Sequence, residues 1–246
     1  MFSKIPVPHF EWNEEDRAYT LMFFPLVGLV TGALVCCINM PAAAGYIPAA
    51  VRILLTIAIP LAVTGGIHID GFMDTEDALS SYADKEKKLE ILKHPHTGAF
   101  AVISLIRAGL IHAAAVCAVL LNPRTDMKII IIYCLVFVIS RCCSGLTSVF
   151  FSKARTTGMI SDMTRDVKRP VVAGLIIQLI AAAGVMIWLK IFCGMAVLLG
   201  AVVFTFIYRQ KAYKEFGGVT GDTAGWYLSV LETVCAVVVG VMSYVA

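Results

Sequence analysis

Long apolar runs recur along this chain and constrain its fold more than any other feature. About twenty predominantly apolar residues are needed for one helix to cross the hydrocarbon core of a bilayer. The fifth and sixth runs are separated by little more than Lys190, so either a tight hairpin or a total of six spans fits. We therefore predict an all-α, polytopic integral membrane bundle of about seven transmembrane helices, in one domain over residues 1–246. The candidate spans are residues 19–39, 46–64, 98–121, 127–150, 171–189, 191–208 and 224–245.

Composition excludes several classes of protein. At 59% hydrophobic and 15% charged residues, the chain is more apolar than a typical soluble domain. The formal charge of +3 is too small to predict a nucleic-acid partner. The eight cysteines lie in or beside apolar runs without a C-x-x-C pair, so they are predicted to be packing residues of the membrane helices.

Positive charge predicts the orientation, because Lys and Arg are retained on the cytoplasmic side of membranes. With seven spans, the N-terminus and the loops 65–97, 151–170 and 209–223 share one side, which receives fourteen Lys and Arg residues. The opposite side receives only Arg124 and two lysines. This asymmetry predicts a cytoplasmic N-terminus and an external C-terminus. One cytoplasmic active site could then draw on all three loops.

An acidic segment, residues 65–77, directly follows an apolar run. If it is helical, Asp70, Asp74 and Asp77 stand at i, i+4 and i+7 and share one face. Three like charges on one face favour a bound cation, and carboxylate oxygens suit Mg²⁺ or Mn²⁺. The preceding Gly-Gly pair allows a tight chain path. The remaining acids nearby are interleaved with lysines and are predicted to form a solvated helix face: Glu76, Asp84, Glu86 and Glu90.

Charges inside the predicted spans are costly unless they are paired or hydrated. Arg52 and Arg107 are predicted to snorkel or pair structurally. Arg141 is a better candidate to reach an anion held near the acidic segment. Glu232 is predicted either to pair with one of these arginines or to line a polar cavity, and His112 to pack or hydrogen-bond between helices.

Two further loops carry chemistry suited to phosphate. In residues 153–158, Lys153 and Arg155 stand beside two hydroxyls and a glycine. In residues 216–225, a glycine-rich turn with Asp222 opens the last span, so backbone N–H groups could face a phosphate or the carboxylate could complete a metal site. One acidic loop and two loops suited to phosphate binding, all on one face, indicate metal-assisted phosphoryl chemistry.

Together these residues resemble the integral-membrane cobalamin synthases, which are adenosylcobinamide-GDP ribazoletransferases. The family's acidic motif, G-G-x-H-x-D-G-x-x-D-x-x-D-G, is matched except at its last glycine, which is Ala78 here. The resemblance continues through residues 89–93, 98–100, 154–158 and 217–222. The chain departs from the family at residues 94–96, which read His-Pro-His, and at Trp226, where a small residue is usual. The motif residues are Gly65, Gly66, His68, Asp70, Gly71, Asp74 and Asp77, and Arg141 and Glu232 also match.

The resemblance implies that a hydroxyl of α-ribazole, or of its 5′-phosphate, attacks the cobinamide-side phosphorus of adenosylcobinamide-GDP and expels GMP. It implies a multi-pass protein of the bacterial cytoplasmic (inner) membrane that works on the lipid bilayer's cytoplasmic side; a homo-oligomer is compatible with it. The implied catalytic residues are Asp70, Asp74 and Asp77. The implied metal ligands, for Mg²⁺ or Mn²⁺, are these three and Asp222. The implied substrate-binding residues are His68, Lys93, Arg141, Arg155, Thr220 and Asp222.

Two alternatives remain at this stage. A membrane phosphotransferase of the CDP-alcohol type also uses aspartates one helical turn apart, although the Gly-Gly-x-His and Thr-Gly-Asp sequences argue against it. A cation transporter would use the acidic segment as its pathway. Transporter charges are expected near the bilayer midplane, whereas these aspartates follow a span and enter a charged loop.

Overall fold

The computed structural model describes residues 3–5, 19–93, 96–165 and 167–245. Arg17, used in the charge count, and His94 lie outside these described residues. The described chain is helical and contains one isolated β-bridge, which confirms the predicted all-α class. The elements are η1 (Thr20–Phe23), α2 (Phe24–Asn39), α3 (Pro41–Ala44), α4 (Ala49–Thr64), α5 (Ile67–Ser80), α6 (Lys85–Ile91), α7 (Ala99–Leu120), α8 (Met127–Phe150), α9 (Met159–Thr164), α10 (Arg169–Leu189), α11 (Ile191–Phe216) and α12 (Gly221–Val245).

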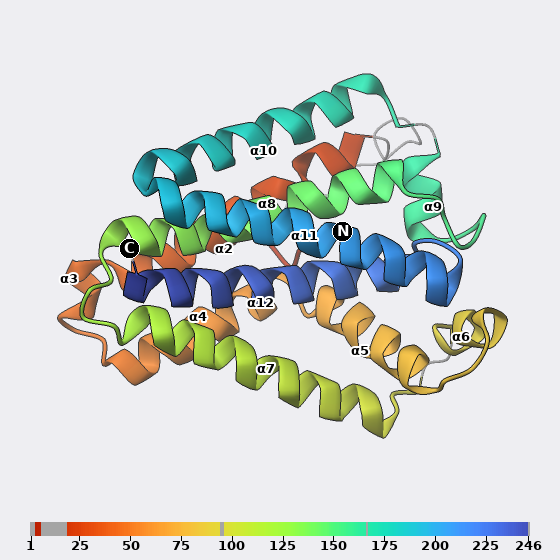
Figure 1. Cartoon of the computed structure of the whole chain (residues 1–246), viewed down its shortest axis with the longest axis horizontal. Helices are drawn as coiled ribbons and strands as arrows, with labels where there is room; N and C mark the ends of the chain where they lie inside the picture. The colour runs from red at the N-terminus through yellow and green to blue at the C-terminus, as the bar shows by residue number, and fades with distance from the viewer. Residues whose placement is uncertain (1–2, 6–18, 94–95, 166, 246) are drawn as a thin grey trace.

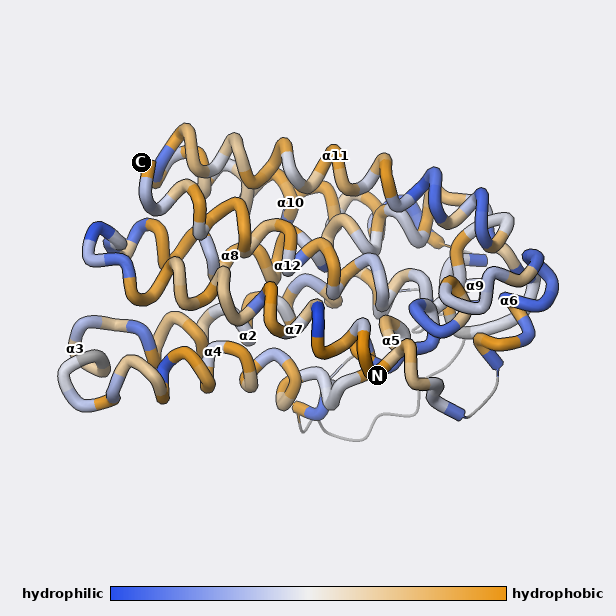
Figure 2. The backbone as a smooth tube through the Cα atoms, turned by 60° about the horizontal axis from the view of Figure 1, so that its bottom comes forward, coloured by the Kyte–Doolittle hydropathy of each residue, from blue (hydrophilic) through white to orange (hydrophobic). Residues whose placement is uncertain are grey.

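Within the described residues, six helices are long and apolar enough to cross a membrane: η1 with α2, then α7, α8, α10, α11 and α12. The predicted span at residues 46–64 is the shorter helix α4, whose 16 residues extend about 24 Å. A seventh crossing requires α4 and α5 together, and these two helices meet at 92°. Apolar residues line the middle of the bundle, and hydrophilic ones gather near its ends (Figure 2). The protein is therefore a multi-pass membrane protein.

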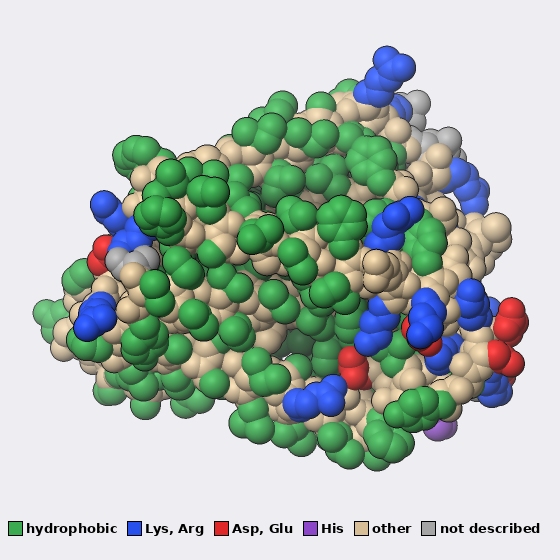
Figure 3. All heavy atoms as spheres, in the orientation of Figure 1, with side chains coloured by type: hydrophobic (Ala, Val, Ile, Leu, Met, Phe, Trp, Pro, Cys, Tyr) green, Lys and Arg blue, Asp and Glu red, His purple; other side chains and the backbone are tan. Residues whose placement is uncertain are grey.

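Helix α8 forms the centre of the bundle. It packs against α2, α10 and α12, and 78% of its most apolar stretch is buried. Helices α7, α10 and α11 instead present large apolar side chains on the outside, including Trp188, which is 83% exposed. The space-filling view shows such side chains over the middle of one face and charged ones toward its ends (Figure 3). This is the pattern expected of a bundle whose sides contact lipid.

A pair of glycines makes the bend between α4 and α5. Gly65 has φ = +66° and Gly66 has φ = +81°, a left-handed backbone that glycine adopts without steric cost. The backbone N–H of Lys4 donates to the carbonyl oxygen of Val63 at 2.8 Å beside this turn. The bend turns α5 away from the direction of α4, so the acidic helix packs across α12 and α7.

The connections separate into two ends of the bundle. Helices α6 and α9 and the α11–α12 connection lie at one end, while α3, the α10–α11 connection and the C-terminus lie at the other (Figure 1). Lys190 is the only residue between α10 and α11. Of the two options that the sequence left open at that point, the structure has the tight hairpin. The three predicted loops lie at one end of the bundle (Figure 1).

Candidate active site

The acidic helix α5 packs directly against the start of α12. A Cβ atom added at Gly71 would lie 2.9 Å from the backbone oxygen of Asp222, so only glycine permits this approach. The contact brings Asp222 beside the acidic helix, although the two are far apart in the sequence. Asp74 lies close enough to Asp70, Asp222 and Asp77 for all three charges to act on it. The segment is helical, which is the condition for the three aspartates to share one face, and it carries the predicted carboxylates to the α12 loop.

Asp77 uses both carboxylate oxygens to cap helix α7. Its Oδ1 accepts a hydrogen bond from the backbone N–H of Ala101 at 2.8 Å, and its Oδ2 accepts one from the N–H of Gly98. Helix N-termini leave backbone N–H groups unpaired, and a carboxylate there also interacts favourably with the helix dipole. Asp77 is thus engaged with α7, and its role as a metal ligand stays a prediction.

Glu76 is not part of a solvated helix face, and that prediction was wrong. Its side chain is 13% exposed and lies between two other helices. Its Oε1 accepts a hydrogen bond from the indole Nε1 of Trp226 at 2.7 Å, and its Oε2 lies 3.5 Å from the Arg107 guanidinium. Sequence reasoning missed this link; the signal was Trp226 itself, an indole at a position where a small residue is expected.

Backbone hydrogen bonds join two of the predicted loops. The N–H of Ala154 donates to the Val219 carbonyl at 3.0 Å, and the N–H of Val219 donates to the Ser152 carbonyl at 2.9 Å. This isolated bridge holds the loop after α8 against the turn before α12. The third loop joins through α6, where Lys88 forms an ion pair with Glu215 of α11 at 2.5 Å. The three predicted loops therefore meet at one place.

Arg155 is the cation of this region that lies beside the carboxylates. Its guanidinium donates to the carbonyl oxygen of Leu89 on α6, and its charge acts on Asp222. Its Nε is buried and has no hydrogen-bond partner among the described residues. A buried guanidinium N–H without a partner is costly. Arg155 is thus positioned to bind an anion held near Asp222.

Two lysines of the predicted site, Lys153 and Lys93, are not seen to contact the described carboxylates. The ammonium of Lys153 donates to the carbonyl oxygens of Ser148 and Phe151, the latter at 2.8 Å, and so terminates α8. Burial lowers the pKa of Lys153, opposed by a weaker effect of Tyr213. Lys93 is exposed just beyond the end of α6, so its place in the site stays a prediction.

Thr220 forms the N-cap of α12. Its Oγ1 accepts from the N–H of Thr223 at 3.1 Å, while the Thr223 hydroxyl accepts from the N–H of Thr220 at 2.8 Å. This reciprocal pattern resembles a capping box, with a threonine in place of the usual acidic residue. The side chain of Thr220 is buried, and it fixes the chain path that places Asp222 at the first turn.

Arg141 pairs with Glu232 inside the bundle. Its guanidinium donates to the Glu232 carboxylate and to the Phe137 carbonyl, each at 2.8 Å, and the residue is 1% exposed. This confirms the option that Glu232 is a buried partner for an arginine. Whether Arg141 also reaches an anion stays a prediction.

Two further intramembrane residues, Arg52 and His112, hydrogen-bond to neighbouring helices. Arg52 donates to the side chain of Asn39 at 3.4 Å. His112 lies 3.3 Å from the Thr233 hydroxyl and 3.2 Å from the Tyr133 hydroxyl, which joins α7 to α12 and α8. The prediction that His112 hydrogen-bonds between helices is confirmed.

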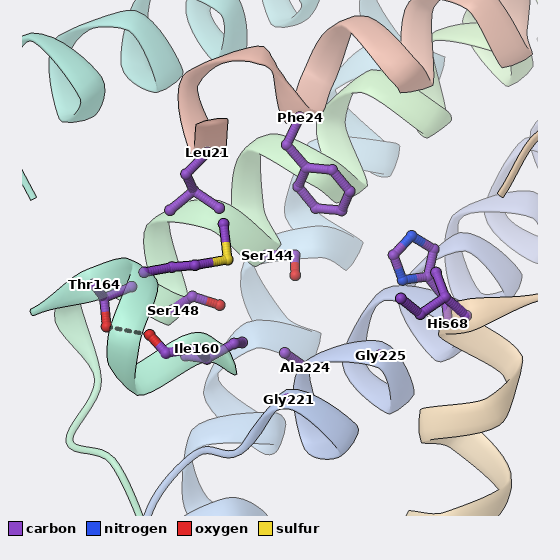
Figure 4. Close-up of a pocket in the computed structure, with 12 residues that line it drawn as sticks. Leu21, Phe24, His68, Ser144, Ser148, Ile160, Thr164, Gly221, Ala224 and Gly225 are labelled. Carbon is purple, nitrogen blue, oxygen red and sulfur yellow. Dashed lines mark hydrogen bonds between the residues drawn. The ribbon is translucent and has the colours of Figure 1, made fainter. Parts of the chain in front are cut away.

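A pocket that is open to solvent lies among η1, α2, α5, α8, α9 and the start of α12. We call it the His68 pocket. The imidazole of His68 projects toward it opposite the ring of Phe24, and Ser144 and Ser148 contribute hydroxyls from α8 (Figure 4). Sequence reasoning placed His68 in the site but missed the pocket. Two serines one helical turn apart in an apolar span were the available signal.

The carboxylates suit a cation that also binds phosphate. Among the described residues, no group of three or more His, Cys, Asp or Glu side chains is arranged so that it could hold a metal ion by itself. Mg²⁺ usually binds through one or two carboxylates together with waters and substrate phosphates. The charges of Asp70 and Asp222 act on Asp74, and a divalent cation would relieve that repulsion. Their role as metal ligands stays a prediction.

Comparison with known proteins places the chain in a family. It is 37% identical to the adenosylcobinamide-GDP ribazoletransferase of Lachnoclostridium phytofermentans over 232 residues, covering 93% of this chain and 85% of that one. It is 31% identical to the protein of the same name from Clostridium perfringens, covering 98% and 95% of the two chains. No solved structure matches it. The model of the cobalamin-5-phosphate synthase family matches residues 1–240, and the chain belongs to this family.

Proposed function

We propose that the protein is an adenosylcobinamide-GDP ribazoletransferase of the late nucleotide-loop assembly steps of cobalamin biosynthesis. A hydroxyl of α-ribazole, or of α-ribazole 5′-phosphate, attacks the cobinamide-side phosphorus of adenosylcobinamide-GDP. A new O–P bond forms, the bond from that phosphorus to the bridging oxygen breaks, GMP leaves and the hydroxyl proton is released. The products are adenosylcobalamin, or its 5′-phosphate, and GMP. The relatives that carry this activity in their names support the proposal.

The observation that carries the proposal is the meeting of α5 with the start of α12. It gathers Asp70, Asp74 and Asp222 with the Arg155 guanidinium at one end of a membrane bundle. Carboxylates with one adjacent arginine fit a pyrophosphate substrate that arrives with a divalent cation. Asp70, Asp74 and Asp222 would hold Mg²⁺ or Mn²⁺, which neutralises charge on the transferred and leaving phosphates. Arg155 binds a phosphate oxygen through the guanidinium N–H groups not used by Leu89.

The location follows from the charge asymmetry of the chain. The end of the bundle that carries α6 and α9 receives most of the Lys and Arg residues. We place this end in the cytoplasm and the protein in the bacterial cytoplasmic membrane. The active-site loops then face the cytoplasm, into which GMP is released.

The test is turnover by the purified full-length protein in detergent or liposomes. GMP release and corrinoid product are followed together with adenosylcobinamide-GDP and α-ribazole, with Mg²⁺ and with EDTA. Wild-type protein is expected to form product with Mg²⁺ and not with EDTA. The Asp74→Asn variant is expected to form no product in either condition. Glu86→Gln is the matched control, because it also removes one negative charge but lies exposed on α6. Turnover of a CDP-alcohol donor instead, with no corrinoid product, would overturn the proposal.

A further inference from the structure

The His68 pocket shares its walls with the elements that hold the predicted phosphoryl-transfer residues. Helix α5 contributes His68 to the pocket and Asp70 to the acidic cluster. The start of α12 contributes Gly221 and Ala224 to the pocket, and Asp222 lies between them in the sequence. A ligand in this pocket would therefore lie next to the carboxylates without occupying their place.

The residues that line the pocket do not suit the charged parts of either substrate. Among its described lining residues there is no Lys, Arg, Asp or Glu. Leu21 and Phe24 give the pocket apolar lining, and Ser144 and Ser148 contribute hydroxyls to it (Figure 4). A pyrophosphate requires cationic groups. A flat aromatic ring with a polar edge suits an apolar pocket that contains a few polar groups.

His68 supplies the polar group that lacks a partner. Its Nε2 is buried and makes no hydrogen bond to any described residue. Its ring centroid lies 5.6 Å from that of Phe24 at an interplanar angle of 59°. A neutral imidazole nitrogen accepts or donates one hydrogen bond, depending on the tautomer. A bound ring nitrogen or sugar hydroxyl would therefore satisfy an atom that the protein leaves unpaired.

We propose that the His68 pocket binds the benzimidazole-type base of the acceptor nucleoside, α-ribazole. This inference rests on the proposed function and extends it by assigning the acceptor a subsite. The lining, mainly apolar side chains with a few polar groups, is of the kind that binds small molecules. The corrinoid substrate then approaches the carboxylates from outside this pocket.

The first experiment fills the pocket. Ser148→Leu is expected to raise the KM for α-ribazole about tenfold or more and to leave the KM for adenosylcobinamide-GDP unchanged. Phe150→Leu is the matched control: it lies two residues further along α8, is 66% exposed and is expected to change neither constant. Thermal unfolding of both variants establishes that they are folded.

The second experiment measures binding without turnover, with benzimidazole as the probe. Wild-type protein is expected to bind it, His68→Phe to bind it at least several-fold more weakly, and His68→Gln to recover part of the loss. If the wild-type protein forms no corrinoid product, the proposed function is overturned. The benzimidazole binding data would still show whether the pocket binds this base. Normal turnover with unchanged acceptor KM in Ser148→Leu, or benzimidazole binding unaffected in His68→Phe, would overturn the pocket assignment alone.

Discussion

The indole Nε1 of Trp226 donates a 2.7 Å hydrogen bond to Oε1 of Glu76, which ties the last helix of the bundle to its acidic helix. Trp226 also stacks on Tyr208, and the ammonium of Lys211 lies 4.9 Å from its ring centroid. Glu76 precedes Asp77 on α5. The link therefore helps to fix the position of α5 relative to α12, on which the geometry of the carboxylates depends.

Replacement of Trp226 by Phe is expected to destabilise the protein by about 1–2 kcal/mol, because Glu76 stays buried and loses a hydrogen-bond donor. Thermal unfolding in detergent measures the change. Trp188→Phe is the control, since Trp188 is 83% exposed on the outside of α10. Equal melting temperatures for the two variants would show that the buried indole of Trp226 contributes no more to stability than the exposed indole of Trp188.

Mg²⁺ is expected to raise the melting temperature of the substrate-free protein. A ligand that binds only the folded state stabilises it by about 2.7 kcal/mol at a concentration of 100 Kd. Asp74→Asn is expected to abolish the Mg²⁺-dependent rise. Without metal its melting temperature should match or exceed that of wild type, because one of the repelling charges is removed. A full Mg²⁺ response in Asp74→Asn would place the cation elsewhere.

Asp77 is expected to differ from Asp74, because its oxygens already bind the backbone of α7. Asp77→Ala should cost about 1 kcal/mol of stability, the usual penalty for loss of an N-cap. Asp77→Asn keeps one acceptor and should cost less. Both are measured by thermal unfolding alongside turnover. Loss of activity in Asp77→Ala without any loss of stability would favour the role of metal ligand over that of helix cap.

Local features of the fold were predictable, and long-range contacts were not. The spacing of Asp70 and Asp74 indicated that they would share one face if the segment is helical, and the Gly65–Gly66 pair allowed a tight turn before it. The helix α5 and the turn are both present. Glu76 was misassigned because its neighbours in the sequence suggest solvent. The residue that covers it, Trp226, comes from the other end of the chain. No local periodicity encodes which side chain of a distant helix will lie over a given carboxylate.

The same limitation applies to Arg141. Its position in an apolar span made it a candidate to reach an anion. The sequence left Glu232 either to pair with one of three intramembrane arginines or to line a polar cavity. The structure places the two 2.8 Å apart, with exposed fractions of 1% and 12% for their side chains. Burial of both charges costs desolvation energy, so the pair is retained only with good geometry and additional hydrogen bonds. Ser140 provides one to Glu232 at 2.9 Å.

This arrangement predicts strong coupling between the two residues. Glu232→Gln or Arg141→Met alone leaves one buried charge without its partner and is expected to cost about 3–5 kcal/mol. The double variant, with Met at 141 and Gln at 232, removes both charges and should cost less than the sum of the single changes. Thermal unfolding of all four proteins gives the coupling energy directly. If the costs add and Arg141→Met mainly raises the KM for adenosylcobinamide-GDP, Arg141 binds substrate and its pairing with Glu232 contributes little to the fold.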